Sequence, residues 1–186
     1  MRSPEVAMRK FHQQKISERQ EKPSEGKICE GKLIGECTEK HQEHLPYHLA
    51  IAQVKENQPT KLPQFAEGLT DTVDYLLHPD ELDGTENIKF YTACGSTLDK
   101  KHGIDAFMEI NDNGKVHRIT LDITMNPTKI EHKADVIIHV PEEGINMKNN
   151  PQLFRKTTEE AAKQIIKKFE EKKEQFLADI SIRKYN

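Results

Sequence analysis

The sequence of 186 residues contains no tryptophan and only three cysteines, and 34% of its residues are hydrophobic. An odd, unpatterned set of cysteines argues against a disulfide framework and is typical of a reducing compartment. The chain starts without an apolar segment of signal-peptide length, and no window holds the roughly 18 apolar residues of a membrane span. We therefore expect a cytoplasmic protein with no membrane partner; export by a route without a cleaved signal stays open.

Charge is nearly balanced, with 28 basic and 31 acidic residues and a net charge of −3. This balance neither indicates nor excludes nucleic acid as a partner, and the sequence does not determine the oligomeric state. The length suits one domain with an appendage. Residues 1–64 are predicted to form a polar N-terminal arm, partly disordered and partly wrapping the rest, and residues 65–186 an α/β domain.

Apolar periodicity predicts the elements of that domain. Apolar residues recur at three- and four-residue spacing from Phe65 to Leu77, which predicts an amphipathic helix. Four strand-like runs follow, at residues 88–94, 104–110, 116–125 and 134–140. The last third is predicted to be a helix capped at Thr157 or Thr158. This order predicts an α+β fold with a four-stranded mixed or antiparallel sheet flanked by helices.

The dipeptide Asn113-Gly114 is a favoured two-residue hairpin turn, because both of its positions must adopt positive φ. With this turn, one face of the hairpin is apolar, with Met108 facing Ile119, Ala106 facing Leu121 and Ile104 facing Ile123. On the other face, Glu109 faces Arg118 and Asp105 faces Asp122. A four-residue loop is the alternative; it keeps the parity of the faces and makes the two aspartates diagonal neighbours.

Two carboxylates that face each other repel, which raises one pKa or requires a cation between them. Mg²⁺ suits such a pair because it takes oxygen ligands, keeps several waters and needs only one or two carboxylates from the protein. The alternative is that Asp105 and Asp122 both lie in solvent, where water and salt screen the repulsion.

The segments Gly103-Ile104-Asp105 and Leu121-Asp122-Ile123-Thr124 resemble the two motifs of the PD-(D/E)xK nuclease superfamily, which has the restriction-endonuclease-like fold. The resemblance covers roughly residues 65 to 180 as topology. It implies hydrolysis of phosphodiester bonds in nucleic acid by an endonuclease or exonuclease, with Mg²⁺ or Mn²⁺ held by Asp105, Asp122 and the carbonyl of Ile123. Glu109 could add a ligand or pair with Arg118.

The lysine of the second motif is missing, because Thr124 stands in its place. Lys129, or else Lys133, could reach back from beyond the strand and take over its role, which would preserve catalysis. Without such a lysine, the chain would be a non-catalytic module of the same fold that binds a protein or nucleic-acid partner. We therefore expect Asp105, Asp122 and Lys129 to be the catalytic residues if the chain is an enzyme.

Soft metal ligands gather in the predicted arm, at Cys29, Cys37, His41 and His44. Their spacing matches no standard zinc finger, in which paired ligands lie two to four residues apart. We therefore interpret this stretch as a polar wrapping segment and do not expect zinc.

Overall fold

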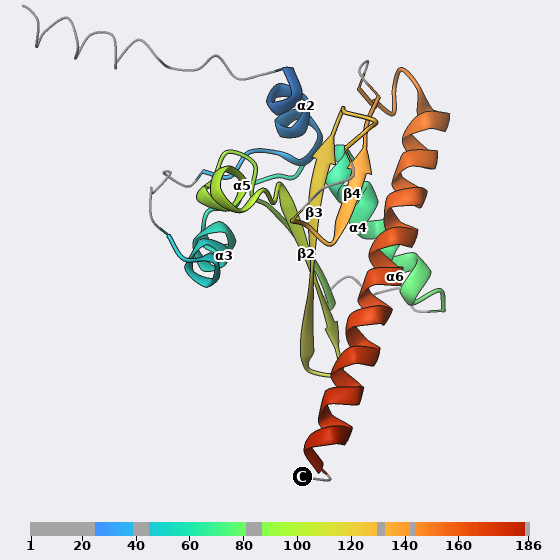
Figure 1. The fold of residues 1–186 in the computed structure, drawn as a ribbon. Coiled ribbons are helices and arrows are strands. Elements are labelled where there is room, and N and C mark those ends of the chain that lie inside the picture. Colours follow the sequence, from blue (N-terminus) through green and yellow to red (C-terminus); the bar gives the residue numbers. More distant parts are fainter. Residues whose placement is uncertain (1–24, 39–44, 81–86, 130–132, 142–143, 185–186) are drawn as a thin grey trace, which may run out of the picture.

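The computed structural model describes residues 25–38, 45–80, 87–129, 133–141 and 144–184. It is an α+β fold in which a four-stranded sheet has helices on both faces (Figure 1). The helices are α2 (Glu25–Ile34), α3 (Tyr47–Glu56), α4 (Gln64–Leu77), α5 (Thr97–His102) and α6 (Pro151–Lys184). The strands are β1 (Ile88–Thr92), β2 (Ala106–Asp112), β3 (Lys115–Thr124) and β4 (Val136–His139). The predicted helix at Phe65 and all four predicted strands are present.

The sheet is mixed, with the strand order β1-β2-β3-β4. The first three strands are antiparallel, and β4 runs parallel to β3. A parallel neighbour must be reached by a crossover, which usually takes a dozen or more residues and a helix. Here only residues 125–135 lie between β3 and β4, fewer than such a crossover usually takes.

The hairpin of β2 and β3 has the predicted turn. Asn113 has φ 52° and Gly114 has φ 85°, and the Gly114 N–H donates to Asn111 Oδ1 at 3.0 Å. The register that the turn predicts is confirmed from Asp112 opposite Lys115 to Ala106 opposite Leu121. The right-handed twist of the strands matches such a turn, and for this reason a two-residue loop is favoured over the longer alternative.

The inner face of the sheet, covered by α4 and α6, forms the larger buried core. Apolar side chains of alternate strand residues pack there against apolar side chains of both helices. The cluster includes Met108, Ile119 and Leu121 from the strands, Phe65 and Leu69 from α4, and Phe154 and Ile165 from α6. Because the register puts most apolar residues of β2 and β3 on this side, with Phe107 and Val116 on the other, a slip of one residue would expose the core residues.

The predicted start of the C-terminal helix was wrong. Helix α6 begins at Pro151, and the side chain of Asn150 accepts a hydrogen bond from the Leu153 N–H at 3.1 Å. Asn is a strong capping residue, and Pro suits the first helical position. Thr158 lies inside the helix and donates to the carbonyl of Phe154 at 2.8 Å.

The outer face of the sheet is covered in part by α3 and α5 (Figure 1). A second buried cluster lies beneath them, formed by Ala50, Ile51, Val54, Ala93, Leu98, Ile104 and Phe107. Helix α2 contributes Leu33 and Ile34 to the larger core. The described part of residues 1–64 therefore packs on the sheet as a wrapping segment, and the boundary at residue 64 does not separate two cores. Residues 1–24 lie outside the described part of the chain.

The turn gives a first testable prediction. Gly114→Ala places a side chain at φ 85°, in the left-handed region, which costs about 1–2 kcal/mol for an L residue. We expect the free energy of unfolding, measured by urea denaturation, to fall by this amount. Gly68→Ala is the control: a Cβ there would meet the Phe154 ring at an ordinary 3.6 Å, and alanine favours a helix by about 0.5–1 kcal/mol. Equal stabilities for the two variants would contradict the turn geometry.

Candidate acidic site

Asp105 and Asp122 are both buried at the end of the sheet where β2 begins and β3 stops, with 6% and 4% of their surface exposed. The backbone fixes Asp105 between two strands. Its carbonyl accepts from the Ala93 N–H at 2.8 Å, and its N–H donates to the Leu121 carbonyl at 2.9 Å. Screening by solvent, the alternative for these two carboxylates, does not apply to side chains this deeply buried.

The chain departs from the hairpin register at Asp105. The paired ladder ends at Ala106, and the Asp105 carboxylate accepts a hydrogen bond from the Ile123 N–H at 2.7 Å. The predicted place of Ile104 opposite Ile123 was wrong: Ile104 packs with Phe107 in the outer cluster, and Ile123 lies in the inner core. The reason is the bend at Asp105, which turns its side chain toward the backbone of β3.

Lys129 lies against the acidic pair. Its Nζ is 2.6 Å from Asp122 Oδ2, and its side chain is 37% exposed, so the ammonium faces both the aspartate and solvent. Thr124, in the place of the motif lysine, accepts through its hydroxyl from the Asn126 N–H at 3.1 Å. Lys133 passes close to Gly103, since a Cβ there would be 3.8 Å from its Cδ. The connection after β3 therefore brings a lysine to the site by another route.

Burial raises the pKa of Asp105 to about 8, and the hydrogen bond from Ile123 offsets this only in part. The negative charges of Glu30, Asp99 and Asp122 raise the pKa further. Four carboxylates from α2, α5, β3 and the start of β2 therefore share one region, and in the absence of a cation this chain protonates Asp105 near neutral pH.

Glu30 and Asp99 had no place in the sequence prediction, because α2 and α5 were not predicted as helices. For α5 a signal exists: Ser96 caps the helix through its side chain, and Gly103, with φ 65°, ends it. These are the residues preferred at the two ends of a helix. The short helix then lies directly before Asp105.

Glu109 does not lie with the acidic pair. It is four residues from Asp105, about 13 Å along an extended strand, which exceeds the reach of one Mg²⁺ ion. Its Oε1 is 2.6 Å from Arg118 and its Oε2 is 2.8 Å from Lys55. Burial raises the pKa of Glu109, but these hydrogen bonds and charges outweigh it and lower the pKa. The predicted alternative for Glu109, an ion pair with Arg118, is the arrangement present.

The oxygen atoms at the site are of the type that a hard divalent cation takes as ligands. Asp105 and Asp122 supply carboxylates; the Leu121 carbonyl points toward β2, and alternation along the strand directs the Ile123 carbonyl to the same side. Within the described residues, no group of three or more His, Cys, Asp or Glu side chains is arranged to hold a metal. Two carboxylates with a carbonyl and water are nevertheless a sufficient set for Mg²⁺.

Of the four residues considered for zinc, the structure describes the side chain of Cys37, so the prediction about zinc stays untested. Cys37 is buried, and its thiol donates to the Asn57 carbonyl at 3.3 Å. His41, His44 and the side chain of Cys29 lie outside the described part of the chain.

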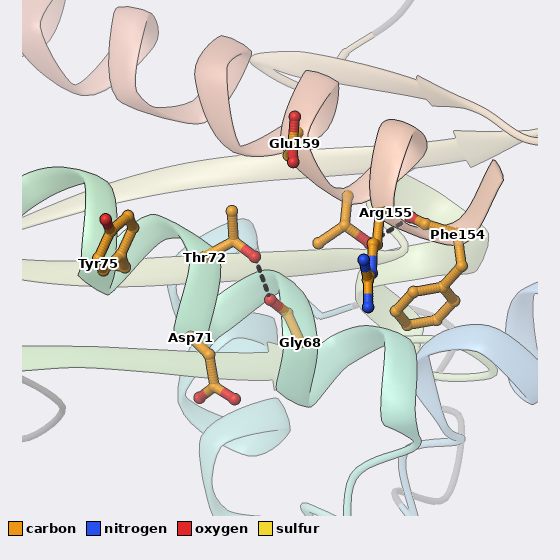
Figure 2. Close-up of a pocket in the computed structure, with 8 residues that line it drawn as sticks. Gly68, Asp71, Thr72, Tyr75, Phe154, Arg155 and Glu159 are labelled. Atoms are coloured by element: carbon orange, nitrogen blue, oxygen red, sulfur yellow. Dashed lines mark hydrogen bonds between the residues drawn. The ribbon is translucent and has the colours of Figure 1, made fainter. Parts of the chain in front are cut away.

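A groove of about 400 Å³ lies between α4 and α6, the two helices that cover the inner face of the sheet (Figure 2). Thr72 and Thr158 donate their hydroxyls to carbonyls of their own helices, so they present methyl groups to the groove. Asp71, Arg155 and Glu159 line it as well. It contains none of the predicted site residues.

No protein-family model, curated protein or solved structure matches this chain. Among the described helices, none combines the length and the apolar character needed to span a membrane.

The raised pKa of Asp105 gives a prediction about stability. Because its folded-state pKa is about 8 against an ordinary 3.8, the folded state binds more protons than the unfolded state between about pH 4 and pH 8. The free energy of unfolding therefore falls as pH rises through this window, by up to about 1.4 kcal/mol per pH unit. Asp105→Asn removes this loss, so its stability relative to the wild type should increase from pH 4 to pH 8.

Urea denaturation at several pH values measures this difference. Asp80→Asn, a substitution of an exposed aspartate, is the matched control and should show no such trend. A stability difference for Asp105→Asn that stays constant from pH 4 to pH 8 would rule out the raised pKa.

Proposed function

We propose that this chain is a nuclease-like domain with a restriction-endonuclease-like core, which hydrolyses phosphodiester bonds of nucleic acid with a divalent metal ion. One observation carries the proposal: Lys129 Nζ lies 2.6 Å from the carboxylate of Asp122, although position 124 has no lysine. A buried aspartate directly before β2, a second on β3 and a lysine are the types of residue that the motif contains, in a different arrangement.

In this proposal Asp105, Asp122 and the Ile123 carbonyl hold Mg²⁺ or Mn²⁺. The ion would lower the pKa of a bound water and offset the charge that develops on the phosphate. Asp105 must be ionised to bind the ion. Because burial and the neighbouring carboxylates oppose this ionisation, a bound cation has to offset their repulsion with Asp105. Asp122 positions Lys129, whose partly exposed ammonium reaches a water or a phosphate oxygen in front of the site.

The topology supports this assignment of the fold. Helices cover both faces of a mixed sheet (Figure 1). The two aspartates lie at the end of the sheet where β2 begins and β3 stops. Only residues 125–135 separate β3 from β4, fewer than a helical crossover usually takes, and Lys129 belongs to this short connection. A cytoplasmic location, where Mg²⁺ and nucleic acid are both present, is part of the proposal.

A second candidate function is a non-catalytic module that binds a protein or nucleic-acid partner. The ion pair of Asp122 with Lys129 favours it, because this pair neutralises the aspartate without any metal. Metal binding and strand cleavage together distinguish the two candidates.

The test measures cleavage of plasmid DNA, single-stranded DNA and RNA by the purified chain in Mg²⁺ or Mn²⁺. Asp122→Asn and Lys129→Met should each lower the cleavage rate by about 100-fold or more, the usual contribution of a positioned catalytic group. Asp80→Asn and Lys163→Met, at exposed positions, are the matched controls and should cleave like the wild type.

Titration calorimetry with Mn²⁺ provides a readout independent of cleavage. Asp105→Asn should abolish Mn²⁺ binding, and Lys129→Met should retain it. Binding without cleavage of any substrate would favour the non-catalytic module, and cleavage that survives Asp122→Asn would show that a contaminant is responsible.

A further inference from the structure

A second group of charges lies on the outer face of the sheet, near the hairpin turn. A hollow of about 240 Å³ is lined there by residues of β1, β2, β3 and the end of α3, namely Lys55, Asn87, Lys89, Tyr91, Glu109, Asn111 and Val116. We call it the hairpin pocket. Phe107, buried under α3 between Asp105 and Glu109, separates this pocket from the acidic site.

The hairpin pocket carries excess positive charge. Glu109 is 7% exposed and has Lys89 on one side and Arg118 on the other as its cross-strand partners. Its two oxygens are occupied by Lys55 at 2.8 Å and Arg118 at 2.6 Å. Lys55 and Lys89 line the pocket, and Arg118 lies beside it, paired with Glu109. In and next to the pocket, three cations and one carboxylate leave two positive charges. The buried carboxylate holds the Lys55 ammonium in place, so an anion entering the pocket meets an ammonium group that is already positioned, with the Arg118 guanidinium next to the pocket.

The remaining walls supply a flat ring and amides. Tyr91 stacks on Phe107 with ring centroids 4.9 Å apart, and Lys55 Nζ lies 5.4 Å from the centre of the Tyr91 ring. The side chain of Asn111 accepts from the Gly114 N–H through its oxygen, which directs its NH₂ group to other partners. Asn87 adds a second amide. The two amides can donate hydrogen bonds to a ligand, and the Tyr91 ring offers it an apolar surface.

We propose that the hairpin pocket binds a phosphomonoester, either on a free nucleotide or at the end of a nucleic-acid strand. Such a group carries a charge of about −1.5 to −2 at neutral pH and has three strong acceptor oxygens, which match two excess positive charges and several donors. A carboxylate carries one charge and fewer acceptors. The pocket is smaller than the roughly 300–1,000 Å³ of typical ligand sites. We therefore expect it to hold the phosphate group and one ring of the attached nucleotide, which would lie against Tyr91.

Calorimetry with the full Asp122→Asn chain tests this binding, because that variant should not consume the ligand. The probes are uridine 5′-monophosphate, uridine, and one oligodeoxynucleotide with and without a 5′-phosphate. We expect the phosphate to tighten binding by about tenfold or more. Adding Lys89→Met should remove most of this gain, and adding Lys61→Met, an exposed lysine elsewhere, should not. Lys89 is exposed, so its loss should leave the fold intact, which circular dichroism checks.

Binding of the monophosphate identifies a free nucleotide as the ligand, and binding of the phosphorylated oligonucleotide alone identifies a strand end; both support the pocket. Equal affinities with and without phosphate, or a phosphate effect that Lys89→Met leaves unchanged, would overturn it. The proposal is independent of the nuclease proposal. Loss of cleavage in Lys129→Met tests only the acidic site, and loss of phosphate binding in Lys89→Met tests only the hairpin pocket.

Discussion

The turn at Asn113-Gly114 determines which side chains of β2 and β3 share a face of the sheet. Because successive residues of a strand alternate between faces, fixing two residues in a turn fixes every pair up to Ala106 and Leu121. The inner face then receives most of the apolar residues, together with the buried His117, and can be covered by α4 and α6. The outer face receives the polar residues, including Glu109, Arg118 and Asp122. The core and both charged sites thus depend on the same local reversal of the chain.

Burying carboxylates is unfavourable unless hydrogen bonds or opposite charges compensate, and the protein uses a different compensation for each. Asp122 has the ammonium of Lys129, and Glu109 has Lys55 together with Arg118. Asp105 has one backbone N–H and three negative neighbours, so it is compensated least and its pKa is raised most. Among these three carboxyls, Asp105 is therefore the one whose environment calls for a cation.

Features encoded locally could be predicted from the sequence. The turn needs only Asn and Gly at two adjacent positions, and the strands show themselves by alternation. The pairing of Glu109 with Arg118 follows from the register alone. The start of α6 is also encoded locally, by Asn150 and Pro151, but Thr157 and Thr158 further along are competing candidates for the cap, which made the predicted start wrong.

Features that depend on tertiary packing could not be predicted in this way. The sequence contains few apolar residues before position 64, yet Leu33 and Ile34 are buried because α2 lies against α4 and β3. Lys129 was a candidate on the grounds of reach, but its contact with Asp122 depends on the path of the chain from Thr124 to Lys129, which no periodicity describes. The chain bends at Asp105, whose carboxylate accepts a hydrogen bond from the Ile123 N–H. Ile104, directly before this bend, therefore lies in the outer cluster.

The position of Lys129 in a connection has a consequence for how this site can change. A lysine at position 124 would be held by the ladder of β3, so moving its ammonium would require shifting the strand and the whole core with it. On the connection, an insertion or deletion of a single residue can reposition the ammonium while the sheet stays the same. The sheet and the position of the ammonium can therefore vary independently. Related chains could gain, reposition or lose this positive charge while keeping the same fold.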